Sequence, residues 1–173
     1  MEILVALERL LSEFLSLKNS DADNHVIVHM LNNDVFHWYG AILGPESTPY
    51  EGGYFLYHIE FPQDYPSSPP DFYFITPMFH PNIRSDGRVC CEVFTTERWQ
   101  STISVRAIFS YIIGLLNEPR PQAGYIGEAT ELCETNKAAY NQKVREYTDN
   151  YGNLKWIKSL NSEDKEIADT IET

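Results

Sequence analysis

The apolar positions along the chain follow first a helical period and then a strand period. The first twenty residues predict an amphipathic helix, because apolar side chains recur at spacings of three and four: Leu4, Leu7, Leu11, Phe14 and Leu15. Residues 25–31, 35–43, 54–61 and 71–76 are rich in β-branched and aromatic residues and are separated by turn sequences, which predicts four strands. In the third of these segments Phe55, Tyr57 and Ile59 alternate with residues of the opposite face.

The second half of the chain predicts three helices. Residues 104–119 are apolar on nearly every side and end at Pro119, a pattern that is typical of a buried helix. Residues 127–136 and 137–160 follow as two further helices, of which the second is amphipathic. One helix, a four-stranded antiparallel meander and three more helices make an α+β fold, with the sheet and the helices largely segregated.

Composition and charge limit the kind of protein that this chain can be. A length of 173 residues with 43% apolar residues suits one globular domain with a full core. The net charge of -12 disfavours a protein whose main task is to bind nucleic-acid phosphates, and it favours basic partners. No apolar run reaches the length that spans a membrane.

The N-terminal stretch and the cysteine content indicate a compartment. The stretch lacks a basic lead-in and a small-residue cleavage site, so we expect an amphipathic helix there and not a signal peptide. Three cysteines in such a chain point to reduced thiols. We therefore expect a cytoplasmic location, with the nucleus as the alternative.

The stretch FHPNIRSDGRVCCEVF, at residues 79–94, is the strongest chemical signal. A His-Pro-Asn turn leads through Asp86 and Gly87 to the adjacent Cys90 and Cys91. A cysteine that carries an acyl group needs a thiolate, access for bulky partners and a donor for the oxyanion, and a position after a turn suits such a thiol. The alternatives are a packing cysteine and a strained disulfide between Cys90 and Cys91. A zinc site that includes His80 is rejected, because the spacing and a fourth ligand are lacking.

Several stretches in order along the chain carry a family resemblance. They are GPESTPYEGG, YFLYHIEFPQDYPSSPP, FHPNI, DGRVC, the Trp99 region and LLNEPRPQ. In this order and at this spacing, they make the chain resemble a ubiquitin-conjugating enzyme. The resemblance implies the ubiquitin-conjugating fold, with a core domain over residues 1–152 and a C-terminal extension over residues 153–173.

The resemblance also implies roles for individual residues. The family's reactive cysteine lies ten residues after the histidine of the turn, as Cys90 lies ten after His80, so Cys90 is expected to form a thioester. Asn82 is expected to donate to the oxyanion or to stabilise its own loop, and the two roles can coexist. His80 and Pro81 are expected to fix the turn, with general base as the alternative role of His80. Cys91 stands where the family usually has leucine and is expected to fill a packing slot.

The implied reaction is an acyl transfer that needs neither a metal nor an organic cofactor, since the activating enzyme uses ATP upstream. Cys90 would accept ubiquitin, or a ubiquitin-like modifier, and pass it to a lysine or to a ligase cysteine. The expected partners are the modifier, an activating enzyme that binds the N-terminal helix, and a ubiquitin ligase, with neither nucleic acid nor membrane. The alternative is a catalytically weak scaffold that binds ubiquitin or a ligase without turnover, although such family members have generally lost the cysteine.

One departure from the family concerns an acidic residue near the site. The loop after the buried helix commonly holds a carboxylate that positions and deprotonates the incoming lysine, and Ala123 occupies this position. Glu92, two residues after Cys90, stands where many members have aspartate and is the candidate for partial compensation. We therefore expect weak intrinsic reactivity toward lysine.

Two surfaces that are expected to bind partners also differ from the family pattern. In the first ligase-facing loop, Ser67 follows Pro66 where family members often have phenylalanine, and in the second loop Ser101 and Thr102 replace part of a frequent Ser-Pro-Ala. Loss of an aromatic anchor predicts weak binding to ordinary ligases, a specialised ligase, or different contacts. The first helix is usually basic but here has a net charge of -1, which leaves the cognate activating enzyme and modifier open.

The chain continues past the usual end of the family's domain. Leu154, Ile157 and Leu160 are expected to lie in a solvated tail, with a longer last helix or a partner contact as the alternatives. From Asn161 onward the tail carries five acidic residues against one lysine, so this part is expected to be mobile.

Overall fold

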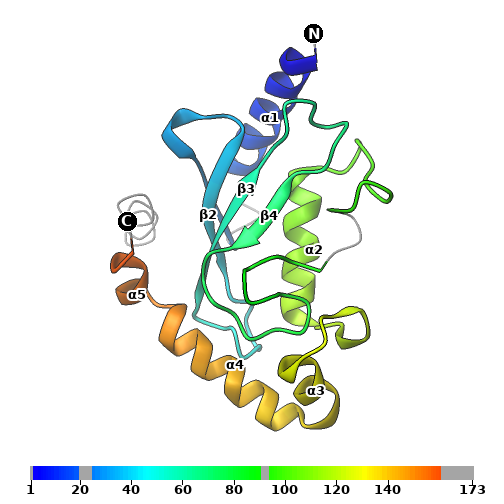
Figure 1. Cartoon of the computed structure of the whole chain (residues 1–173). Helices are drawn as coiled ribbons and strands as arrows, with labels where there is room; N and C mark the ends of the chain where they lie inside the picture. Colours follow the sequence, from blue (N-terminus) through cyan, green and yellow to red (C-terminus); the bar gives the residue numbers. More distant parts are fainter. Residues whose placement is uncertain (1, 20–24, 91–93, 161–173) are drawn as a thin grey trace.

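The computed structural model describes residues 2–19, 25–90 and 94–160, and its elements follow the predicted order (Figure 1). Helix α1 (Glu2–Lys18) precedes four strands: β1 (Val26–Met30), β2 (His37–Leu43), β3 (Tyr54–Glu60) and β4 (Asp71–Phe74). Four helices follow: α2 (Val105–Asn117), α3 (Glu128–Thr135), α4 (Lys137–Tyr151) and α5 (Leu154–Lys158). The short 3-10 helices are η1 (Leu31–Asn33) and η3 (Pro121–Ala123). The predicted α+β class is confirmed.

The four strands form one antiparallel sheet in the order β1-β2-β3-β4. The predicted alternation in β3 is confirmed, because Phe55, Tyr57 and Ile59 are all buried on one face. On the neighbouring strands Trp38 lies opposite Ile59, and Phe74 lies opposite Tyr57. This inner face of the sheet makes one half of the main hydrophobic core.

Helix α2 makes the other half of the core. The side chain of Ser104 accepts from the N–H of Ala107 and so caps the first turn, and the helix ends at Asn117, two residues before Pro119. Its buried residues are Val105, Ile108, Phe109, Ile112, Leu115 and Leu116, and its exposed residues are mostly small or polar. The predicted buried helix is thus confirmed, and Phe109 packs against Tyr57 with ring centres 5.1 Å apart.

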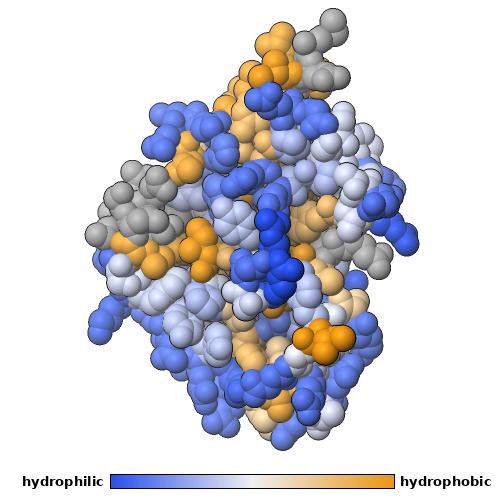
Figure 2. All heavy atoms as spheres, in the orientation of Figure 1, coloured by the Kyte–Doolittle hydropathy of each residue, from blue (hydrophilic) through white to orange (hydrophobic). Residues whose placement is uncertain are grey.

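Helix α1 has a different core-facing side from the predicted stripe. The buried side carries Ala6, Leu10 and Leu17. Three leucines of the predicted stripe face solvent instead: Leu4, Leu11 and Leu15, at 62%, 43% and 56% exposure. In the described part of the chain, five of the seven exposed large apolar residues lie on α1, and Figure 2 shows the resulting hydrophobic surface over this helix.

The predicted last helix is two helices, α4 and α5, with a break at Gly152. The carbonyl oxygen of Gly152 accepts from the N–H of Tyr54 at 2.8 Å, which fixes the end of α4 against β3. A Cβ at Gly152 would lie 2.8 Å from the carbonyl oxygen of Thr148, so glycine suits this close approach. Asn153 then starts α5, because its side chain accepts from the N–H of Trp156 at 2.9 Å.

Helix α5 packs on the outer face of the sheet and is not part of a solvated tail. Ile157 is completely buried in a second cluster with Tyr39, Ala41 and Leu56. The side chains of Leu154 and Leu160 are partly buried against the same cluster. Residues 161–173, the acidic part of the extension, lie outside the described residues. The domain boundary predicted after residue 152 stays a prediction.

Candidate functional site

The histidine of the His-Pro-Asn turn anchors the turn to α2. The Nε2–H of His80 donates to the carbonyl oxygen of Leu115 at 2.9 Å, and its Nδ1 accepts from the N–H of Asn82 at 2.9 Å. Burial lowers the pKa of His80 to about 4, so the ring is neutral at pH 7. Both ring nitrogens are engaged inside the fold, which leaves neither free to act as a base.

Asn82 joins the turn to the loop that follows α2. Its Nδ2 donates to the carbonyl oxygen of Arg120 at 2.8 Å, and its Oδ1 accepts from the N–H of Arg120 at 2.8 Å. The residue is only 1% exposed. The side-chain amide therefore pairs with the backbone N–H and C=O of one residue, Arg120, and it holds the two segments together.

Cys90 lies between the turn and the loop. A short antiparallel bridge joins Ile83 to Val89, and the N–H of Cys90 donates to the carbonyl oxygen of Asn82 at 2.7 Å. The half-buried thiol donates to the carbonyl oxygen of Ala123, at 3.2 Å from the sulfur. Cys90 is thus held by its backbone against the turn, and its sulfur faces the loop.

The loop after α2 approaches the turn at very short range. The N–H of Tyr125 donates to the carbonyl oxygen of Pro81 at 2.8 Å. A Cβ at Gly124 would lie 2.6 Å from the same oxygen, so a larger residue cannot fit without a shift of the backbone. The side chain of Ala123 is exposed, and only its carbonyl oxygen is directed at the sulfur.

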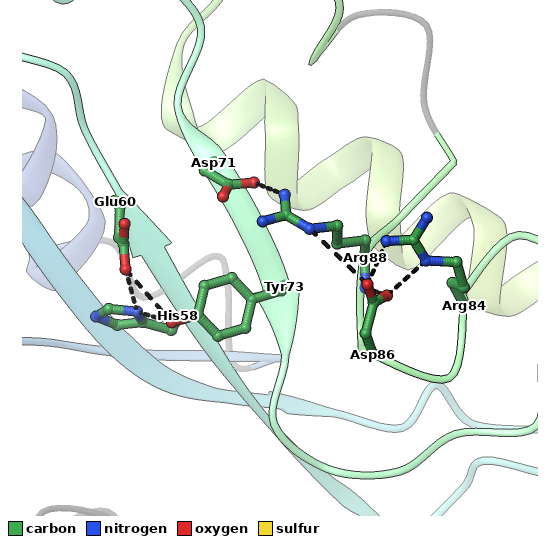
Figure 3. A network of polar contacts seen from close by, with 7 residues as sticks. All are labelled: His58, Glu60, Asp71, Tyr73, Arg84, Asp86 and Arg88. Atoms are coloured by element: carbon green, nitrogen blue, oxygen red, sulfur yellow. Dashed lines mark hydrogen bonds and ion pairs between the residues drawn. The ribbon is translucent and has the colours of Figure 1, made fainter.

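A chain of charged contacts runs from the edge of the sheet to the turn that precedes Cys90 (Figure 3). Arg88 pairs with Asp71 of β4 at 2.5 Å and lies 4.0 Å from Asp86. Arg84 donates to both carboxylate oxygens of Asp86 and lowers the pKa of that residue to about 2. The guanidinium of Arg84 then lies over the ring of Tyr125, 5.9 Å from its centre.

The predicted ligase-facing residues lie on a second pair of loops. The indole N–H of Trp99 donates to the carbonyl oxygen of Pro66 at 2.7 Å, which holds the two loops together. Ser67, Ser101 and Thr102 are exposed. The structure therefore brings Cys90, Asn82, His80 and Pro81 together, and it places the ligase-facing residues in a separate group. Cys91 and Glu92 lie outside the described residues.

The sequence interpretation missed the role of Glu13 on α1. Its carboxylate accepts from the N–H of Val105 at 2.5 Å, at the start of α2, and from the hydroxyl of Tyr65 at 3.1 Å. Arg9 pairs with the same carboxylate. The contact joins residues that are 92 positions apart, so no local pattern could reveal it. Tyr125 and Arg84 were missed for the same reason.

Within the described residues, no three His, Cys, Asp or Glu side chains are grouped in a way that could hold a metal ion. The part of the chain that the structure covers also has no helix of the length and apolarity needed to cross a membrane.

Comparisons with known proteins identify the family of the chain. A family model described as ubiquitin-conjugating enzyme matches residues 9–148. The chain is also similar to the probable ubiquitin-conjugating enzyme E2 31 of Arabidopsis thaliana, with 37% identity over 122 residues. This match covers 70% of the chain and 79% of the plant protein. The chain therefore belongs to the ubiquitin-conjugating enzyme family.

Proposed function

We propose that Cys90 accepts the C-terminal carboxyl group of ubiquitin, or of a ubiquitin-like modifier, as a thioester and then transfers it to a lysine or to a ligase cysteine. The observation that carries this proposal is the position of the thiol. Its backbone is fixed to the His-Pro-Asn turn, and its sulfur lies at the partly open edge of the loop, 3.2 Å from the Ala123 oxygen. A thiol held in this way can exchange acyl groups with large partners.

A loading assay tests the proposal. The protein is incubated with an activating enzyme, ATP and a panel of modifiers, and the products are separated on a non-reducing gel. We expect an adduct that thiols remove, and a stable ester or no adduct with Cys90→Ser. Cys133→Ser, which changes a half-buried cysteine of α3, is the matched control and should load normally. Absence of a thiol-sensitive adduct with every modifier would favour a scaffold that binds without turnover.

The acceptor preference follows from Ala123. An ammonium group must lose its proton before it attacks a thioester, and the Ala123 side chain provides no carboxylate to help. We expect slow discharge of the loaded protein to free lysine and rapid discharge to free cysteine. Ala123→Asp should raise the lysine rate, because the side chain at this position is exposed next to the site. Brisk discharge of the unaltered protein to lysine would contradict this preference.

The exposed apolar face of α1 supports contact with the activating enzyme through this helix. Leu4 and Leu11 are 62% and 43% exposed, and burial of such side chains against a partner is favourable without a basic helix. The double substitution of both leucines by serine should slow loading and leave the unfolding midpoint unchanged. Ser12→Ala, an exposed change on the same helix, is the control. Normal loading of the double variant would show that α1 does not use this face.

A further inference from the structure

The amide expected to stabilise the oxyanion is engaged elsewhere in the structure. Both ends of the Asn82 side-chain amide are hydrogen-bonded to backbone groups of Arg120 at 2.8 Å, and Asn82 is only 1% exposed. These two bonds explain how the loop is held against the turn. A tetrahedral oxyanion on Cys90 needs a donor that is near the sulfur and is not already used in this way.

Tyr125 lies on the loop that contacts the Cys90 sulfur, two residues after Ala123. Its N–H is bonded to the Pro81 oxygen at 2.8 Å, and its own carbonyl oxygen accepts from the Thr130 hydroxyl at 2.5 Å, so its backbone is fixed on both sides. The loop contact between the Cys90 sulfur and the Ala123 oxygen lies two residues away. Burial raises the pKa of Tyr125, and negative charge on Cys90 raises it further, so the phenol keeps its proton.

The ring of Tyr125 is held by Arg84. Arg84 lies over the ring, and Asp86 fixes Arg84 through two hydrogen bonds (Figure 3). Asp86 is in turn 4.0 Å from Arg88, which pairs with Asp71 on the sheet. Among the described residues, no group is hydrogen-bonded to the Tyr125 hydroxyl. The phenol thus belongs to the loop that contacts the sulfur, its ring packs against Arg84, and its hydroxyl is able to donate.

We propose that the Tyr125 hydroxyl is a catalytic group that donates a hydrogen bond to the carbonyl oxygen of the acyl group on Cys90. An attacking nitrogen or sulfur forms a bond to the carbonyl carbon, and the π electron pair moves onto this oxygen. Collapse of the tetrahedral intermediate restores the C=O bond and breaks the C–S bond, so Cys90 leaves as a thiolate. The proton of an attacking amine passes to water, and the phenol keeps its own proton. This inference rests on the proposed function of Cys90.

The test replaces Tyr125 by phenylalanine, which keeps the ring beneath Arg84 and removes only the hydroxyl. A short peptide thioester that ends in Gly-Gly is used to acylate Cys90 without an activating enzyme, and the acyl group is then released with hydroxylamine. Loss of one oxyanion donor costs about a hundredfold or more at a fully enclosed site, and we expect about tenfold at this open one for both steps. Tyr147→Phe, which alters a 37% exposed phenol on α4, is the matched control and should leave both rates unchanged.

A second reaction separates catalysis from structure. Alkylation of Cys90 by iodoacetamide forms no oxyanion, so Tyr125→Phe should leave its rate unchanged. Equal slowing of alkylation and acylation would show a general disturbance of the site and overturn the proposal, as would unchanged acylation. If the unaltered protein fails to load any modifier from an activating enzyme, the proposed function is wrong. The comparison with the peptide thioester still tests the Tyr125 hydroxyl, because that reaction needs no activating enzyme.

Discussion

Replacement of Ile157 by alanine tests whether α5 stabilises the domain. The Ile157 side chain is completely buried in the cluster with Tyr39, Ala41 and Leu56. The sequence had predicted a solvated tail in this part of the chain. Removal of a fully buried isoleucine side chain costs about 2–5 kcal/mol, from lost burial and from the cavity that remains. Because α5 has only five residues and lies at the surface, its neighbours can relax, and we expect a loss of about 2 kcal/mol.

Urea unfolding measures this loss as a lower transition midpoint, while the slope of the unfolding free energy against urea concentration stays constant. For a chain of this length, about 2 kcal/mol also corresponds to a melting temperature that is lower by about 4–8 °C. Lys155→Ala, an exposed change on the same helix, is the control and should stay within about 0.5 kcal/mol of the unaltered protein. If Ile157→Ala and Lys155→Ala unfold at the same urea concentration, α5 does not hold the sheet face in solution.

Two further predictions concern buried polar groups. The folded pKa of His80, about 4, lies below its ordinary value of 6.5, so the unfolded chain takes up the proton first as the pH falls. This residue should therefore contribute stability that is complete above about pH 6.5 and falls by about 3 kcal/mol toward pH 4, and a His80→Gln variant should show a smaller pH slope in urea unfolding. Glu13→Ala should lower the free energy of unfolding by about 2 kcal/mol, because it leaves the N–H of Val105 and the hydroxyl of Tyr65 without their acceptor. Exposed Glu8→Ala is the control, and an equal midpoint for the two glutamate variants would refute this role.

The sequence predicted the elements well, because each has a strong local signal. The strand segments contain the β-branched and aromatic runs that suit a half-buried sheet, and Pro119 lies two residues past the end of α2. The alternation of Phe55, Tyr57 and Ile59 predicted the inner face of β3 correctly. Periodicity was sufficient for the inner face of β3 because three large apolar residues alternate there, but it gave no sign that Leu56 on the outer face is also buried.

Helix α1 shows where periodicity fails. Leucines occupy two sides of this helix, and the stripe with more of them faces solvent, whereas Ala6 and Leu10 face the core. The break at Gly152 was also missed, because one glycine in an amphipathic pattern is compatible with a continuous helix. Only the approach of β3, where Tyr54 bonds to the Gly152 oxygen, makes the break necessary.

The candidate site was predicted from the family resemblance and the spacing of Cys90 and His80, but its internal contacts were not predictable from the sequence. The pairing of Asn82 with Arg120 spans 38 positions, and the stacking of Arg84 on Tyr125 also joins distant segments. Such contacts depend on the final packing of the loop against the turn. For this reason the sequence could offer two roles for Asn82, whereas the structure shows how its amide is used.

The loop beside Cys90 contains some residues that the fold requires and others that can vary. Arg120, Gly124 and Tyr125 are held through their backbone atoms, and Gly124 has no space for a larger residue. Gln122 and Ala123 project exposed side chains from the same loop. Descendants of this chain can therefore acquire or lose a carboxylate next to the thiol by a single substitution at little cost in stability. Evolution can thus change the charge beside the thiol on an unchanged scaffold.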